Sequence, residues 1–266
     1  MKKGYIFDLD GTIYLGDQLI EGAKETIEAL KKRGDKVIFL TNKSIASRED
    51  YVKKLRRLGI STRIDEVINS NVMVAQYLQE QLATGEAVLA IGEQPLFEEL
   101  ERHGISTTEA PEKARFVVLG WDRHFTYEKL NKAFQATKYN AEVIATNPDR
   151  TCPIKGGEIP DCGAMIGALE GATGKPIDQI IGKPSKYLAE MIVGKILSMG
   201  SSDCYIIGDR LETDIKMGVE SGMKSVLVLT GISTKEMAAR SPYKPTYILE
   251  SVRDLVNGCM DGRGER

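Results

Sequence analysis

The sequence is poor in the residues that build zinc sites and disulfide frameworks. It has four cysteines, none in a C-x-x-C pair, and only two histidines among its 266 residues. Because structural zinc is bound mainly by cysteine and histidine, this scarcity argues against a zinc site. The cysteines are expected to be free thiols in a reducing cytosol: Cys152, Cys162, Cys204 and Cys259.

An excess of one charge and long apolar runs are also missing. The chain has 36 Lys and Arg against 38 Asp and Glu, a formal net charge of -2, which predicts neither a nucleic-acid partner nor an anionic membrane surface. No run of 18 apolar residues and no N-terminal apolar segment of the secretory kind is present, so we expect a cytoplasmic protein without a membrane span. Apolar residues still make up 42%, enough for a substantial core.

The most informative stretch is YIFDLDGT at residues 5–12. A short apolar run before a Gly-Thr turn predicts a buried parallel strand, and ligands bind at the carboxyl ends of such strands. Side chains two apart on a strand share a face, so Asp8 and Asp10 are expected to point the same way. Such a pair suits Mg²⁺, a nucleophile or an acid–base group. Taken alone, an acid-rich turn explains the pattern as well.

The rest of the chain alternates between predicted strands and helices. Strands are expected near 36–41, 67–70, 204–207 and 225–229, each next to a helical pattern. This order predicts an α/β fold with a Rossmann-like parallel sheet covered by helices. A second, smaller α/β unit begins near residue 83, contains an irregular Gly/Pro-rich stretch at 147–163, and ends near 179. The predicted domains are therefore 1–82 with 180–266, and the insertion 83–179.

Further polar residues follow predicted strands of the first domain. Thr41 and Asn42 end one strand, Asp209 ends another, and Lys183 precedes a helix. Each has an ordinary explanation as a turn residue or a solvated loop residue, and Asp214 could be an acid favoured in the first turn of a helix. Together at one sheet edge, lysine and hydroxyl groups would hold phosphate while carboxylates hold a metal.

These residues resemble the motifs of the haloacid dehalogenase superfamily of phosphatases. DLDGT at 8–12 is similar to its first motif, Thr41-Asn42 to its second, Lys183 to its third, and GDRLETD at 208–214 to its fourth. The longer strings LTNKS at 40–44 and IGKP at 181–184 are similar to the NagD-type, para-nitrophenyl phosphatase branch. That branch inserts a large α/β cap between the second and third motifs, where residues 83–179 lie.

The resemblance implies Mg²⁺-dependent hydrolysis of phosphate monoesters in two steps. Asp8 would attack phosphorus and form an aspartyl-phosphate, and Asp10 would protonate the leaving alcohol and then help to activate water. The implied metal residues are Asp8, the carbonyl of Asp10, and Asp209, with Asp214 supporting from nearby. The implied phosphate-binding residues are Thr41, Asn42 and Lys183.

Two cap stretches resemble substrate loops of that branch, TNPD at 146–149 and PDCG at 160–163. They make Asn147 and Asp161 candidate specificity residues. Many relatives have glycine where this chain has Asp161, whose carboxylate we expect to accept hydrogen bonds from substrate hydroxyls; the alternative is a solvated turn aspartate. The likeness is greatest to relatives that act on sugar phosphates.

Several alternatives stay open at this point. The substrate could be a nucleoside monophosphate or another small phosphometabolite, and the same core could serve a phosphotransferase or mutase. A receiver-like phosphorylatable switch also uses an aspartate on a parallel sheet, although it needs neither Asp10 nor a large cap. Caps of this branch often pair, which allows a homodimer.

Overall fold

The computed structural model describes residues 2–154 and 156–256. Cys259 and the tail 258–266, whose composition predicts a frayed end, lie outside these residues. The chain divides into two compact units. Unit 1 comprises Met1–Thr41, Arg48–Ile68 and Pro184–Arg266, and unit 2 comprises Asn42–Ser47 and Asn69–Lys183. The assignment of 1–82 and 180–266 to a hydrolase core, and of 83–179 to a cap, stays a prediction.

Unit 1 is built on a six-stranded sheet. Its strands, in spatial order, are β15 (Tyr247–Leu249), β14 (Lys224–Val228), β13 (Cys204–Gly208), β1 (Gly4–Phe7), β4 (Lys36–Thr41) and β5 (Val67–Asn69). The central strand β1 runs parallel to both neighbours, with Gly4 opposite Cys204 and Lys36. All four residues of β1 are buried, as expected for a strand covered on both faces. The predicted parallel α/β class is confirmed.

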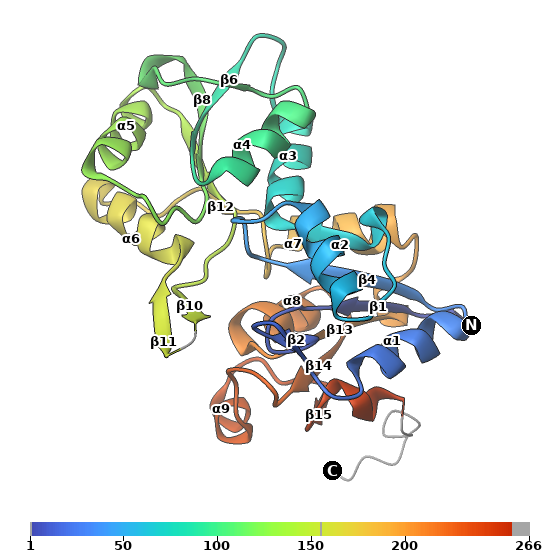
Figure 1. The fold of residues 1–266 in the computed structure, drawn as a ribbon. Helices are drawn as coiled ribbons and strands as arrows, with labels where there is room; N and C mark the ends of the chain where they lie inside the picture. Colours follow the sequence, from blue (N-terminus) through green and yellow to red (C-terminus); the bar gives the residue numbers. More distant parts are fainter. Residues whose placement is uncertain (1, 155, 257–266) are drawn as a thin grey trace. The chain divides into compact units, whose positions relative to one another are not determined.

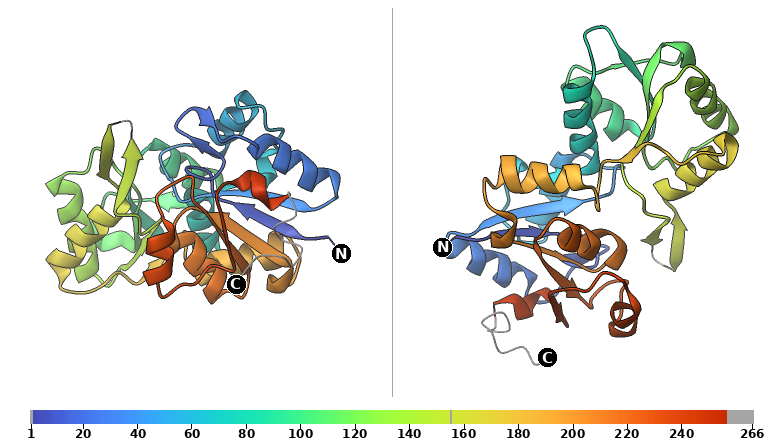
Figure 2. Two further views of the ribbon diagram at one scale, coloured as in Figure 1. Left: turned by 90° about the horizontal axis from the view of Figure 1, so that it is seen from below. Right: turned by 180° about the vertical axis from the view of Figure 1, so that it is seen from behind.

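Helices cover both faces of the unit 1 sheet. α1 (Ala23–Lys32) and α2 (Arg48–Arg57) lie on one face, and α7 (Lys186–Glu190) and α8 (Lys216–Glu220) on the other (Figures 1 and 2). In α1 the buried side chains recur at helical spacing, Ala23, Ile27 and Leu30, and form the face that packs on the sheet. The remaining elements are the hairpin β2 (Tyr14–Leu15) and β3 (Gln18–Leu19), α9 (Lys235–Arg240), and 3-10 turns at Ile64–Glu66, Ser201–Asp203 and Val252–Leu255.

Unit 2 is a second, smaller α/β layer structure. Its sheet has the order β12 (Gln179–Ile180), β9 (Glu142–Ala145), β8 (Ala114–Leu119), β6 (Ala87–Ile91) and β7 (Ser106–Thr107). α3 (Ser70–Gln81) and α4 (Gln94–Arg102) lie on one side of it, and α5 (Tyr127–Lys138) and α6 (Cys162–Thr173) on the other (Figure 1). A 3-10 turn at Pro111–Lys113 leads into β8. The core between this sheet, α5 and α6 is aliphatic with one buried tryptophan, Trp121.

The structure corrects three local expectations. The stretch 147–163 is not wholly irregular, because β10 (Thr151–Ile154) and β11 (Gly157–Pro160) form an antiparallel hairpin within it. The sequence of residues 186–197 predicts one continuous helix, but the segment is α-helical only as far as Glu190 and continues as a π-helical segment, Met191–Ile196. The helix after Asp209 likewise opens with a π-helical segment, Leu211–Ile215.

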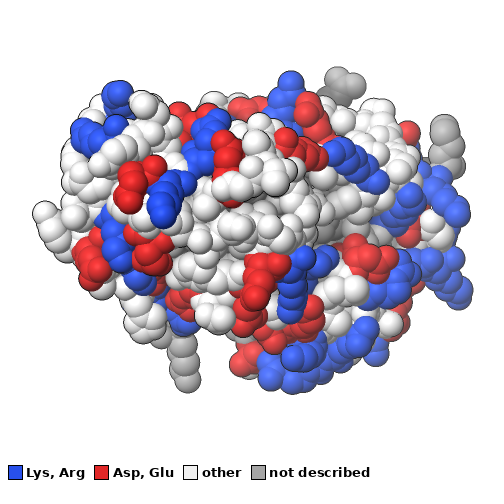
Figure 3. All heavy atoms as spheres, turned by 90° about the horizontal axis from the view of Figure 1, so that it is seen from above, with Lys and Arg blue, Asp and Glu red and all other residues white. Residues whose placement is uncertain are grey.

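The surface and the cysteines agree with the expectations from composition. On the face drawn in Figure 3, basic and acidic side chains are interspersed. Among the residues the structure describes, no helix has both the length and the apolar composition needed to cross a bilayer. Three of the four cysteines, Cys152, Cys162 and Cys204, are confirmed as free and are buried.

Candidate active site

Three neighbouring strands of unit 1 end at predicted site residues. Asp8 follows β1, Asp209 follows β13, and Thr41 is the last residue of β4. Because β1 lies between the other two and runs parallel to both, all three residues come to the same edge of the sheet. This is the carboxyl edge, where open α/β sheets bind ligands.

Asp8, Asp209 and Asp214 form a cluster of buried carboxylates at this edge. Each offers one oxygen, and these oxygens all lie within 4.8 Å of one another. The three residues are 9%, 2% and 0% exposed. Ionised groups this close repel each other, and burial increases the cost. A hard divalent cation with oxygen ligands fits this donor set. Asp214, predicted to act from nearby, lies within the cluster itself.

Glycine backbone makes room for the cluster. Gly11 has a φ of +83°, and a Cβ placed there would lie 2.6 Å from Asp209 Oδ2. A Cβ at Gly231 would overlap the Asp209 carboxylate, and one at Gly208 would overlap that of Asp214. Larger residues at these three positions would therefore displace the carboxylates.

Backbone N–H groups orient two of the carboxylates. Ile232 N donates to Asp209 Oδ2 at 2.8 Å, and Arg210 N donates to Asp214 Oδ2 at 3.2 Å. Each bond uses one oxygen of a carboxylate, which has two oxygens and several lone-pair directions. The donors thus help to fix the side-chain rotamers of the two carboxylates.

Asp10 lies in the turn after β1, next to Tyr14, an aromatic residue for which the sequence predicts no role. Tyr14 of β2 is fully buried, and its main-chain oxygen accepts from Gly11 N at 2.8 Å. Burial, followed by the negative charge of Asp10, raises the pKa of the Tyr14 hydroxyl far above its ordinary value. Lys54 Nζ lies 3.7 Å from the centroid of the Tyr14 ring, a cation–π contact. Tyr14 therefore stays neutral beside Asp10. The only sequence feature that could have pointed to Tyr14 is its position two residues after the Gly11-Thr12 turn.

In unit 2 the structure brings together Asn42 and Lys183, two of the predicted phosphate-binding residues. Asn42 Oδ1 accepts from Lys183 N at 2.8 Å, and Asn42 Nδ2 donates to Lys183 O at 3.1 Å. Lys183 is 2% exposed and Asn42 8% exposed. Thr41, the third residue of the set, directly precedes Asn42 in the chain and is the last residue of β4 in unit 1.

The two predicted specificity residues also lie together in unit 2. Asn147 Nδ2 donates to Asp161 Oδ1 at 3.0 Å and to Asp149 Oδ2 at 2.9 Å, and Thr146 Oγ1 donates to Asn147 Oδ1 at 2.8 Å. These bonds use both N–H groups of the Asn147 amide. A substrate contact through this amide would require one of them to break.

Asp161 is an N-cap, not a solvated turn aspartate. Its carboxylate accepts from Cys162 N at the start of α6, and the residue is 3% exposed. Burial raises the pKa of Asp161 to about 6, against the opposing hydrogen bonds from Asn147 and Cys162 N. Its proposed contact with substrate hydroxyls stays a prediction.

Comparison with known proteins gives consistent matches. A family model described as haloacid dehalogenase-like hydrolase matches residues 5–106, and one described as HAD-hydrolase-like matches residues 180–255. The chain is 39% identical to the sugar-phosphatase AraL of Bacillus subtilis over 97% of this chain and 94% of that protein. It is 34% identical to an acid sugar phosphatase of Staphylococcus aureus over 96% of each. The solved p-nitrophenyl phosphatase of Archaeoglobus fulgidus superposes with a TM-score of 0.90 at 34% identity, covering 97% of this chain and 99% of that one.

Proposed function

This chain belongs to the haloacid dehalogenase-like hydrolases and is a phosphomonoester hydrolase of their NagD-type, para-nitrophenyl phosphatase branch, and we propose that its preferred substrates are small sugar phosphates. The observation that carries the proposed chemistry is the cluster of Asp8, Asp209 and Asp214 at the carboxyl edge of the unit 1 sheet. Support for the substrate class comes from the two relatives named as sugar phosphatases.

The proposed reaction proceeds by two in-line displacements at phosphorus. An Asp8 carboxylate oxygen bonds to phosphorus as the ester P–O bond breaks, and Asp10 gives its proton to the departing alkoxide. A water molecule then bonds to phosphorus, its proton passes to Asp10, and the bond from phosphorus to Asp8 breaks. Inorganic phosphate leaves, and both aspartates return to their starting states.

Asp8 and Asp209, with the main-chain oxygen of Asp10, are the proposed ligands of Mg²⁺, and Asp214 supports them. When bound, the ion would offset most of the negative charge of the carboxylate cluster and stabilise negative charge on the phosphoryl oxygens. Ile232 N keeps Asp209 oriented for this role, and Arg210 N does the same for Asp214.

The proposed phosphate contacts are Thr41, Asn42 and Lys183. Hydroxyl, amide and ammonium donors are suited to the charge on a transferring phosphoryl group. Because the Asn42 side-chain amide is bonded to Lys183, we assign the phosphate contact of Asn42 to its main-chain N–H.

A substrate panel tests the proposed specificity. We expect kcat/KM for pentose and hexose phosphates to exceed that for nucleoside monophosphates and phosphoglycolate by about tenfold or more, the effect of one good hydrogen bond to a charged group. Phosphate release measured with and without an added sugar acceptor would separate hydrolysis from phosphoryl transfer. A preference for nucleoside monophosphates would contradict the sugar-phosphate proposal.

Metal binding is testable without relying on turnover. We expect Mg²⁺ to raise the Tm of the chelator-treated protein, because a ligand that binds only the folded state stabilises it. Asp209→Ala should abolish that shift, together with activation by Mg²⁺. Glu212→Gln is the matched control, since Glu212 is an exposed acid between Asp209 and Asp214. An unchanged Mg²⁺ response in Asp209→Ala would remove this residue from the proposed ligands.

We propose no macromolecular partner for the reaction, only the small phosphate ester. The near-neutral charge balance supports the absence of a nucleic-acid partner. The cytoplasmic location and a homodimer remain predictions from the sequence, and the mass in solution, measured by light scattering, would test the second.

A further inference from the structure

The first and last residues of unit 2 are joined by hydrogen bonds from one side chain. Asn42 is the first residue of the unit and Lys183 is its last. The Asn42 amide both accepts from Lys183 N and donates to Lys183 O, so a side chain pairs with the backbone as a neighbouring strand would. The two residues are 141 positions apart in the sequence.

The backbone before Lys183 is aligned for this pairing. Ile181 N donates to Ala145 O and Gly182 N to Thr146 O, both at 2.9 Å, which extends the β12–β9 pairing towards Lys183. A Cβ at Gly182 would lie 2.7 Å from Asn42 Oδ1. The absence of a side chain at Gly182 therefore lets the Asn42 amide reach the backbone of Lys183.

Asp149 holds the Asn42 amide in this orientation. Asp149 Oδ2 accepts from Asn42 Nδ2 at 2.8 Å, on the N–H that does not bond to Lys183 O. The same oxygen accepts from Asn147 Nδ2 at 2.9 Å. A carboxylate oxygen only accepts, so it selects the orientation in which the NH₂ group of Asn42 faces Asp149 and Oδ1 faces Lys183 N.

The chain of hydrogen bonds is anchored at the start of α6. Asn147 Nδ2 also donates to Asp161 Oδ1, and that carboxylate caps α6 through Cys162 N. Gly163 N donates to Asp149 O at 2.8 Å, which fixes the main chain of Asp149 against the same helix. Asp149 is thus held through its side chain by Asn147 and through its main chain by Gly163, in addition to its contact with Asn42.

We propose that Asp149 is a positioning residue for phosphate binding, acting through Asn42 to hold the backbone of Lys183. The proposal rests on the proposed role of Lys183 as a phosphate contact. In this proposal Asp149 does not contact the phosphoryl group itself. Its carboxylate orients the Asn42 amide, and the amide holds the Lys183 backbone. The Lys183 ammonium group is thereby kept in position. Misplacement of a catalytic group by about 1 Å can cost on the order of 100-fold in rate.

Charge and positioning predict opposite results at this residue. Removing a negative charge near a phosphate site should strengthen phosphate binding through the electrostatic term. Loss of the hydrogen bond from Asn42 to Asp149 should weaken phosphate binding, because the Lys183 backbone is then no longer held in place. Asp149→Asn removes the charge and keeps an oxygen that can accept both amide N–H groups, whereas Asp149→Ala removes both the charge and the acceptor.

The experiment measures Ki for inorganic phosphate and kcat/KM for para-nitrophenyl phosphate in the full chain with Mg²⁺. In Asp149→Ala we expect Ki to rise about tenfold and kcat/KM to fall about 10- to 100-fold. In Asp149→Asn we expect Ki at or below the wild-type value and most of the activity restored. Should Asp149→Ala not fold, Asp149→Ser serves in its place, since its short hydroxyl cannot reach both amides.

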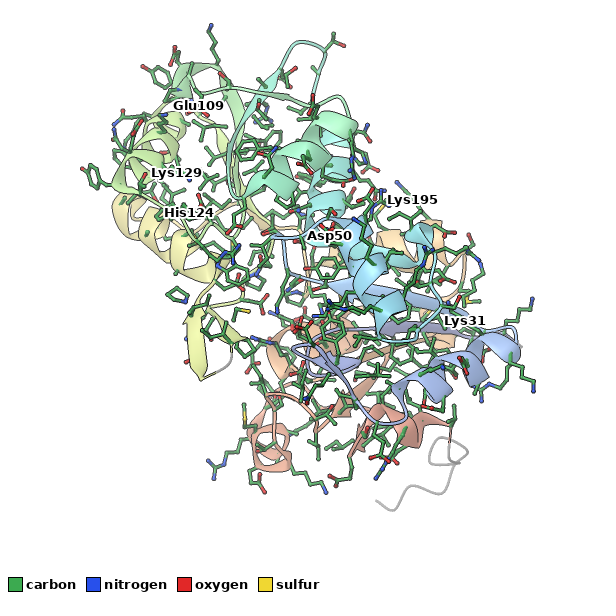
Figure 4. The ribbon with its side chains drawn as sticks, viewed as in Figure 1. Lys31, Asp50, Glu109, His124, Lys129 and Lys195 are labelled. Carbon is green, nitrogen blue, oxygen red and sulfur yellow. The ribbon has the colours of Figure 1, made fainter. Side chains whose placement is uncertain are left out.

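The matched control is a buried carboxylate of unit 2 that also accepts two hydrogen bonds. Asp122 is 1% exposed and accepts from Lys129 Nζ at 2.6 Å and His124 N at 2.8 Å. Lys129 and His124 are labelled in Figure 4, near the start of α5. Asp122→Ala should lower Tm as much as Asp149→Ala and leave Ki for phosphate unchanged.

Each outcome has one meaning. A Tm loss in Asp149→Ala with Ki unchanged would overturn the proposal and leave Asp149 with a structural role alone. Equal effects of Asp149→Asn and Asp149→Ala would also overturn it, because the acceptor would then not matter. Lys183→Ala distinguishes the proposed phosphate contact of Lys183 from the proposed positioning role of Asp149. An unchanged Ki in Lys183→Ala would contradict the phosphate contact itself. A raised Ki in Lys183→Ala, with no effect of Asp149→Ala on Ki, would reject only the positioning role of Asp149.

Discussion

Asp8→Asn is expected to abolish phosphomonoester hydrolysis while the protein stays folded. The asparagine amide has the size of the carboxylate but is no nucleophile, so no aspartyl-phosphate can form. Loss of the nucleophile in other covalent enzymes lowers kcat by on the order of 10⁶-fold. Stability should be unchanged or raised, since Asp8 N keeps its bond to Ile207 O and one of three clustered negative charges is removed.

The measurement is kcat for para-nitrophenyl phosphate together with Tm in chelator. Asp50→Asn is the control, because Asp50 is an exposed acid on α2, labelled in Figure 4, and should keep full activity. Normal turnover by folded Asp8→Asn would contradict the covalent mechanism. A large fall in Tm would instead show that the repulsion within the cluster is already relieved without a cation.

Periodicity and turn residues predicted the main sheets because these signals are local. The strands at Lys36–Thr41 and Cys204–Gly208 lie within one residue of where the sequence places them. The sequence does not reveal the hairpin of β10 and β11, because its pairing depends on cross-strand partners, such as Cys152 and Ile159, in a stretch whose glycines and prolines favour turns. The sequence does not distinguish the π-helical segments from α-helix, because a π-helix differs only in its i→i+5 hydrogen bonds over about one turn.

The site divides in the same way between local and long-range signals. Asp8 and Asp209 could be found because each follows an apolar strand, and the parallel sheet then brings both to one edge. No local signal pairs Asn42 with Lys183, because the bond joins residues 141 apart. The same limit hid Asp149, whose role depends on a hydrogen-bond chain that exists only in the folded unit.

Asp10→Asn should produce a loss of activity that depends on the leaving group. Asp10 lies in the turn after β1, next to the buried Tyr14. In this setting a carboxylic acid can deliver its proton to a departing alkoxide, which an amide cannot do. The Asp8 nucleophile and the other members of the carboxylate cluster are untouched by this substitution.

For alkyl esters such as sugar phosphates, we expect Asp10→Asn to lower kcat/KM by about 10²–10⁴-fold, the usual contribution of general acid catalysis. For para-nitrophenyl phosphate the loss should be much smaller, because its leaving group departs readily without a proton. The ratio of the two losses, measured on the same preparation, is the diagnostic quantity, since any general damage to folding or phosphate binding cancels in it. Asp8→Asn should give no such difference, because the nucleophile serves both esters alike. If Asp10→Asn slows alkyl and aryl esters by the same factor, Asp10 does not protonate the leaving group, and the mechanism proposed here needs another acid.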